Sequence, residues 1–158
     1  MKKNYLSIIL SLFFCVGTLT YTHAQVKSKE KITEKFTKEE KGKFSVVYEY
    51  TTENSFDAIK SGQKNLPASG LSEQKFGEIL TAQFGGRKPT LTPTEQAAAI
   101  NLNKLIEKDK QEYDKQVNKV VLAQNLTLKK YEQMKEEHLK NRFFQNEIYE
   151  IILKKGNK

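Results

Sequence analysis

Apolar residues in the second half of the chain recur three, four or seven positions apart, which is the period of an amphipathic helix. Thr92 stands directly before Pro93, and Glu95 follows three residues after Thr92, which is the pattern of a capping box at a helix start. The sequence therefore predicts a helix over about 93–123, with Thr92 as its cap. Its apolar stripe consists of Leu102, Ile106, Tyr113, Val117, Val120 and Val121.

A second apolar stripe runs from about residue 128 nearly to the C-terminus. Thr127 is placed to cap this helix, and Leu126 and Tyr131 are spaced as a hydrophobic staple. Because only a short link separates the two stripes, we expect helices 93–123 and 128–155 to form a long antiparallel hairpin. The expected core of this hairpin is Leu102, Ile106, Val117, Val120, Phe144, Ile148 and Ile152.

Shorter helices are expected before the hairpin. Ser72 is the predicted cap of one of them, which should end at the glycine pair 85–86. Residues 54–60 are expected to form another that ends at Gly62, and residues 67–70 (PASG) to form a turn. The predicted fold class is mainly α, with one or two shorter N-terminal helices beside the hairpin.

Residues 44–52 (FSVVYEYTT) have two interpretations, a short β-strand or the start of a helix. Val46, Tyr48 and Tyr50 share one face at a period of two, and β-branched and aromatic residues favour a strand. A lone strand would need a partner for the hydrogen-bonding groups of its backbone.

Before this segment, residues 25–43 are rich in Lys and Glu, which predicts a charged, flexible arm. We expect residues 44–158 to form one small helical domain.

The N-terminus has the pattern of a secretory signal peptide. Lys2 and Lys3 precede an apolar run from residue 5 to 19, and the small residues Thr22 and Ala24 fit cleavage before Gln25. A retained membrane anchor is the alternative, but the run is shorter than the roughly 20 residues that span a bilayer. We therefore expect an exported protein, periplasmic or secreted, with no membrane span once residues 1–24 are removed.

The remaining 134 residues contain no cysteine or tryptophan and one histidine, His138. This excludes a Cys/His nucleophile pair, a thiolate metal site and a multi-histidine metal site, while carboxylate or Ser-Lys chemistry remains open. His138 is expected to be an ordinary surface or flanking histidine. We predict no catalytic residue, no cofactor and no metal ligand, and hence no enzyme.

Removal of residues 1–24 takes away two lysines and no acid, which lowers the formal net charge from +8 to +6. The lysines alternate with Glu and Gln, which is typical of a solvated helix face rather than of a phosphate track. Arginines interleaved with base-stacking aromatic residues are missing, so nucleic acid is not an expected partner. An anionic surface, such as acidic glycans or lipid headgroups, fits the charge. The segment 85–89 (GGRKP) is expected to be a linker, with a small anion-binding loop as the alternative.

Three segments follow one another in the second half of the chain. They are a long predicted helix rich in Lys, Glu and Gln, the link Asn125-Leu126-Thr127, and the predicted helix that contains Tyr131 and Met134. From residue 71 onward the chain resembles an uncharacterised bacterial family of short exported helical proteins, a domain of unknown function. This resemblance implies a helical fold and no catalytic residues. The segment 91–96 (LTPTEQ) is also similar to a helix-start motif of small periplasmic stress-response chaperones.

Three functions are therefore carried forward. The first is a non-catalytic helical interaction module of the cell envelope, which binds another envelope protein. The second is a periplasmic stress-type chaperone that binds unfolded clients. The third is a secreted surface protein that pairs through a strand at 44–52.

Overall fold

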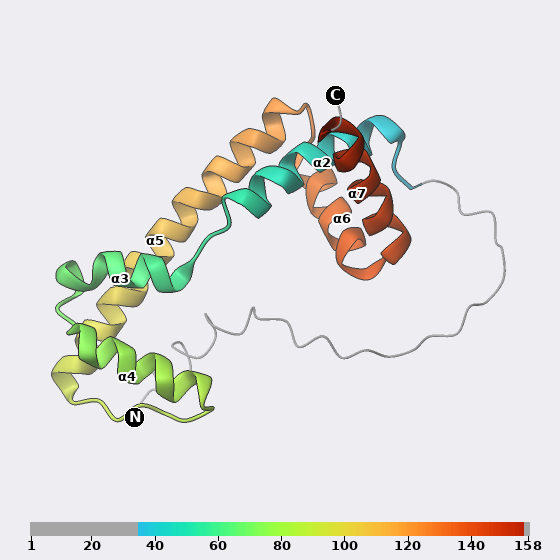
Figure 1. Cartoon of the computed structure of the whole chain (residues 1–158). Coiled ribbons are helices and arrows are strands. Elements are labelled where there is room, and N and C mark those ends of the chain that lie inside the picture. The colour runs from blue at the N-terminus through green and yellow to red at the C-terminus, as the bar shows by residue number, and fades with distance from the viewer. Residues whose placement is uncertain (1–34, 157–158) are drawn as a thin grey trace, which may run out of the picture. The chain divides into compact units, whose positions relative to one another are not determined.

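The computed structural model describes residues 35–156, which form a mainly helical protein with no strand among them (Figure 1). Its helices are α2 (Lys38–Glu53), α3 (Ala58–Ser69), α4 (Glu73–Phe84), α5 (Pro93–Ala123), α6 (Leu128–Lys140) and α7 (Arg142–Gly156). The predicted signal peptide, 1–24, and residues 25–34 of the predicted arm lie outside the described residues. No described helix is both long enough and apolar enough to cross a membrane.

The described chain divides into two compact units. The first contains residues 58–108, and the second contains residues 35–57 and 109–156. Helix α5 is continuous, so its first half belongs to the first unit and its second half to the second. The single helical domain expected over 44–158 stays a prediction.

The second unit is built on α7, against which both α2 and α6 pack (Figure 1). Phe44 lies at the centre of an aromatic cluster, with ring centroids 5.8 Å from Tyr131 and 5.9 Å from Phe144. The buried core of this unit is Phe36, Phe44, Val47, Val117, Val121, Leu126, Tyr131, Met134, Phe144 and Ile148. Ordered apolar burial of this kind is the main source of stability in a chain without disulfides.

Of the two interpretations of residues 44–52, a strand or the start of a helix, the strand is wrong, because these residues lie within helix α2. Phe44 and Val47, three positions apart, are the buried apolar residues, and Tyr48 packs against the same core. The period-two spacing of Val46, Tyr48 and Tyr50 therefore does not reflect a strand. Tertiary packing outweighs their β propensity and favours the helix. The third candidate function, a secreted surface protein that pairs through a strand at 44–52, therefore has no strand to pair through.

Helix α2 also extends into the predicted arm. Thr37 is its N-cap and forms a complete capping box with Glu40, whose carboxylate accepts from the Thr37 backbone N–H at 2.8 Å. Phe36 directly before the cap is only 3 % exposed. Residues 35–43 are therefore part of the folded second unit, and their high charge concealed a helix start.

The expected helix 128–155 is broken into α6 and α7 at Asn141. Asn141 leaves the helical conformation, and its side-chain oxygen accepts from the backbone N–H groups of Phe143 and Phe144 at 3.0 and 3.3 Å. One asparagine thus ends α6 and satisfies the free donors at the start of α7. The predicted hairpin of two long helices is not observed in that form.

The first unit consists of α3, α4 and the first half of α5. Helix α3 begins four residues later than expected and runs through Gly62 and Pro67, where a helix end and a turn were predicted. The carbonyl groups at its end are satisfied by side chains: Ser69 donates to Leu66 at 2.8 Å and Asn101 to Ala68 at 3.2 Å. These bonds make a turn of helix favourable where sequence alone predicts a break.

The residues expected to form one hairpin core fall in both units. Leu102 and Ile106 are buried in the first unit. Val117, Phe144 and Ile148 are buried in the second unit, with Val120 and Ile152 packed against its core.

The three predicted caps stand at helix starts. The hydroxyls of Ser72 and Thr127 accept from the backbone N–H groups of Lys75 and Lys130 at 3.2 Å, and the hydroxyl of Thr92 accepts from that of Glu95 at 3.3 Å.

Candidate functional site

A groove of about 540 Å³ in the second unit is a candidate site for a ligand or a partner's side chain. Helices α2, α5 and α6 each contribute residues to it. Its aromatic lining consists of Phe44, Tyr48, Tyr113, Tyr131 and His138. No sequence segment contains this set, because the contributing helices are far apart along the chain.

The three tyrosines of the groove keep their protons well above neutral pH. Burial raises the pKa of Tyr131 to about 12, and burial also raises the pKa of Tyr113. The pKa of Tyr48 is raised by its hydrogen bond with the Tyr149 hydroxyl, at 3.2 Å, and then by burial. All three hydroxyls are therefore neutral at pH 7 and offer hydrogen-bonding groups without charge.

His138 is buried, whereas the sequence predicted a surface or flanking histidine. Its ring lies 4.6 Å from the Tyr48 ring and 6.0 Å from the Phe44 ring, measured between centroids. Its Nε2 atom has no hydrogen-bond partner among the described residues. Burial lowers the pKa of His138, so the imidazole is neutral at pH 7. A buried nitrogen without a partner is costly and weakens the packing here.

We expect the second unit to lose stability as the pH falls below about 6.5, the pKa of an unperturbed histidine. Because burial lowers the folded-state pKa of His138, the unfolded chain binds a proton that the folded chain does not. The stability present above about 6.5 is therefore lost as the pH falls toward the lower folded-state pKa. Urea unfolding of the chain from Gln25, which contains no other histidine, measures this loss.

The variant His138→Phe is the control for that titration, because it keeps a ring and removes the titrating group. Its unfolding midpoint should stay nearly constant over the same pH range. The glutamates with lowered pKa values, Glu40 and Glu137 among them, lose their stabilising charge only at more acidic pH. A wild-type midpoint that does not move between neutral and mildly acidic pH would contradict a buried neutral imidazole.

The rim of the groove carries charges that are already paired. Lys110 lies 2.7 Å from Asp114 on α5, and Lys135 lies 3.4 Å from Glu132 on α6. Both pairs are exposed, so each contributes little to stability. The rim has no excess of either charge, and the groove therefore does not select a charged ligand.

Two large apolar side chains stand exposed where α6 meets α7: Leu139 is 73 % exposed and Phe143 is 80 % exposed. Leu139 lines the 540 Å³ groove. Phe143 lines a second hollow of about 300 Å³, whose lining also includes the buried rings of Phe36 and Phe144. We call Leu139 and Phe143 the apolar corner of the second unit.

The second unit also brings a serine and a lysine together, the pair that the sequence left open for catalysis. Lys155 Nζ donates to Ser45 Oγ at 2.6 Å, and Ser45 Oγ donates in turn to the Gly42 carbonyl at 2.7 Å. Ser45 is fully buried, at 0 % exposed, so its hydroxyl cannot reach a substrate. Lys155 also lies 3.6 Å from Glu49, a second contact between α7 and α2. The pair therefore joins α7 to α2 and has no nucleophilic role.

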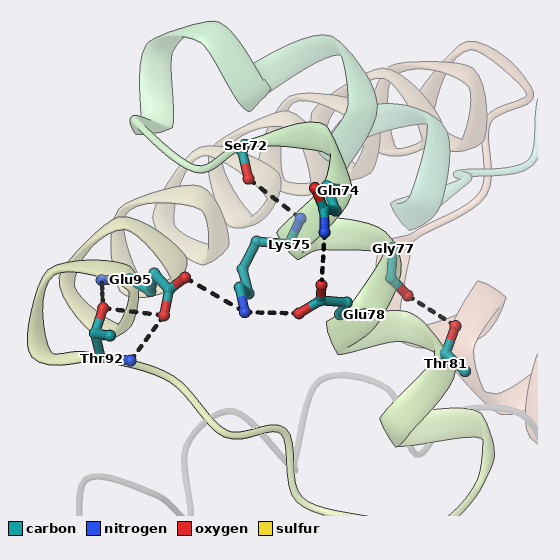
Figure 2. A network of polar contacts seen from close by, with 8 residues as sticks. All are labelled: Ser72, Gln74, Lys75, Gly77, Glu78, Thr81, Thr92 and Glu95. Carbon is teal, nitrogen blue, oxygen red and sulfur yellow. Dashed lines mark hydrogen bonds and ion pairs between the residues drawn. The ribbon is translucent and has the colours of Figure 1, made fainter.

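The first unit contains an open hollow of about 920 Å³ between α4, the α4–α5 connection and the start of α5. Residues of a polar network line part of it, and Figure 2 shows this network, in which Lys75 lies between Glu78 and Glu95. Lys75 Nζ is 2.6 Å from Glu78 and 3.4 Å from Glu95. The carboxylate of Glu95 also accepts from the Thr92 backbone N–H at 2.8 Å, which lowers its pKa. The helix cap and the ion pairs thus form one network.

The described residues contain no group of three or more His, Cys, Asp or Glu side chains placed to hold a metal ion. The chain is a mainly helical protein whose candidate site is an aromatic groove beside an apolar corner. Comparison with protein-family models, with curated proteins and with solved structures finds no match for it.

Proposed function

We propose that this protein is an exported, non-catalytic interaction module of the cell envelope. The partner is another envelope protein, which inserts apolar side chains beside the apolar corner and into the aromatic groove of the second unit. Export is supported by the charged, apolar and small-residue pattern of residues 1–24. The resemblance to short exported helical proteins, with no catalytic residues expected, is consistent with the proposal.

The observation that carries the proposal is the apolar corner. Leu139 and Phe143 are both more than 70 % exposed, and each lines a hollow whose other walls include buried aromatic rings. Exposed apolar side chains beside concave, aromatic-lined surfaces are typical of protein-binding sites. The balanced rim charges indicate that apolar contact supplies most of the affinity.

The chemistry of the groove favours binding over catalysis. The Nε2 atom of His138 has no hydrogen-bond partner among the described residues, whereas a general base needs a proton to abstract and a group to orient it. In the Ser45–Lys155 pair, the Ser45 hydroxyl is buried away from substrate. The groove therefore provides shape and hydrogen-bonding groups, which suit recognition.

A pull-down from envelope extracts tests the proposal, with the chain from Gln25 as bait. We expect one stoichiometric partner that remains bound in high salt. The double variant Leu139→Ser and Phe143→Ser should lower its recovery at least about tenfold, the effect of losing about 1.4 kcal/mol at a binding hot spot. Both side chains are exposed, so the variant should unfold like the wild type.

The matched control removes two exposed apolar side chains from the first unit, Phe84→Ser and Ile100→Ser. It should retain the partner. Equal recovery with both double variants, or binding that disappears in high salt, would contradict the proposed site. Recovery of many unrelated unfolded proteins would instead indicate a chaperone that binds unfolded clients, the second function carried forward from the sequence.

A further inference from the structure

The hollow in the first unit is lined by two cations that have no acidic partner among the described residues. Arg87 and Lys88 are exposed on the α4–α5 connection and line the hollow, and neither forms an ion pair with a described residue. The described residues of this unit, 58–108, contain seven Lys and Arg against four Asp and Glu. This excess attracts anions to the unit, and the unpaired side chains of Arg87 and Lys88 are available to bind them.

The same hollow is also lined by the carboxylates of Glu78 and Glu95, with Lys75 between them (Figure 2). The pKa of Glu78 is lowered by its hydrogen bond from Lys75, and that of Glu95 by its bond from the Thr92 backbone, so both are ionised. A ligand's ammonium group would be repelled by Lys75. A neutral hydroxyl group, however, can donate to the remaining lone pairs of the carboxylates.

We infer that this hollow binds an acidic saccharide, with the sugar carboxylate at Arg87 and Lys88 and sugar hydroxyls at Glu78 and Glu95. A hexuronate carries both kinds of group on one ring. The volume of about 920 Å³ has room for more than one such ring. The site belongs to the first unit and does not depend on the proposed function of the second.

Titration of the isotope-labelled chain from Gln25 with glucuronate, glucose and inorganic phosphate tests the inference by amide NMR. Glucuronate should shift the amide signals of residues 85–91 in a saturable manner. Glucose lacks the carboxylate, and phosphate lacks hydroxyls that can donate to carboxylates at sugar spacing. Both should therefore bind at least about tenfold more weakly than glucuronate.

The double variant Arg87→Gln and Lys88→Gln should weaken glucuronate binding about tenfold or more. The control Lys104→Gln and Lys108→Gln removes the same charge from exposed positions of the same unit outside the hollow. It should leave the affinity nearly unchanged. Equal weakening by both pairs would show non-specific attraction, and equal binding of phosphate would show a simple anion site. Either result, or no saturable shift at 85–91 in the wild type, would overturn the inference.

Discussion

Replacement of Ile148 by Ala is expected to lower the free energy of unfolding by about 2–5 kcal/mol, the range for truncating a buried isoleucine. Ile148 on α7 is fully buried, at 0 % exposed, in the core that also contains Val47 and Met134. Truncation leaves a cavity because α2 and α6 both pack against α7. Since a small domain is stabilised by only about 5–15 kcal/mol, the variant should lose a large share of its stability.

Leu153→Ala is the matched control for that substitution. Leu153 lies on the same helix but is 67 % exposed, so its truncation removes little buried surface. Urea unfolding should show a lower midpoint for Ile148→Ala and a nearly unchanged midpoint for Leu153→Ala. Ile148→Val should fall between them, at a cost of about 0.5–1.5 kcal/mol. Coincident curves for the two alanine variants would contradict the placement of Ile148 in the core.

Helix starts could be located from the sequence because a cap depends on residues within a single turn. The hydroxyl of Thr127 accepts from the Lys130 backbone N–H, and Leu126 and Tyr131 are both buried in one core. Asn125 before them adopts a left-handed conformation, with φ of 54°. Short-range chemistry of this kind is visible in a sequence window of a few residues. The same signal was present at Thr37 and Glu40, where the charged surroundings hid it.

The packing partners of the helices could not be predicted in this way. An apolar stripe from Met134 to Ile152 is compatible with one long helix or with two that fold back on each other. Two helices form because Asn141 interrupts the stripe, and its side-chain oxygen accepts from the backbone N–H groups at the start of α7. Because α7 then packs against α2, residues about 100 positions apart, such as Tyr48 and Tyr149, come into contact.

The candidate groove could not be predicted from the sequence either, because its lining residues are far apart along the chain. Phe44, Tyr113 and His138 belong to three different helices, and no spacing between them is informative. His138 was expected at the surface because it follows two glutamates, yet its ring lies against Phe44 and Tyr48 in the fold. By contrast, the absence of cysteine and of a second histidine after residue 24 limited the chemistry from the sequence alone.

Gly62→Ala should destabilise the first unit, although alanine favours a helix over glycine by about 1 kcal/mol. A Cβ atom at position 62 would lie 2.7 Å from Cζ of Phe76 and 3.4 Å from Cδ1 of Ile106. Both neighbours are less than 10 % exposed, so neither side chain can move away freely. Overpacking of this kind costs about 1–3 kcal/mol, which should exceed the gain in helix propensity.

A double-mutant cycle separates the two effects. Phe76→Leu removes the ring tip that the new methyl group would meet, so Gly62→Ala in that background should become neutral or stabilising. Gly77→Ala, within α4, gains the helix propensity without a contact inside 4 Å and should stabilise the chain by up to about 1 kcal/mol. Thermal or urea unfolding of the four variants measures the coupling. If Gly62→Ala were stabilising with Phe76 present, the close approach of α3 to α4 would not limit the residue at this position.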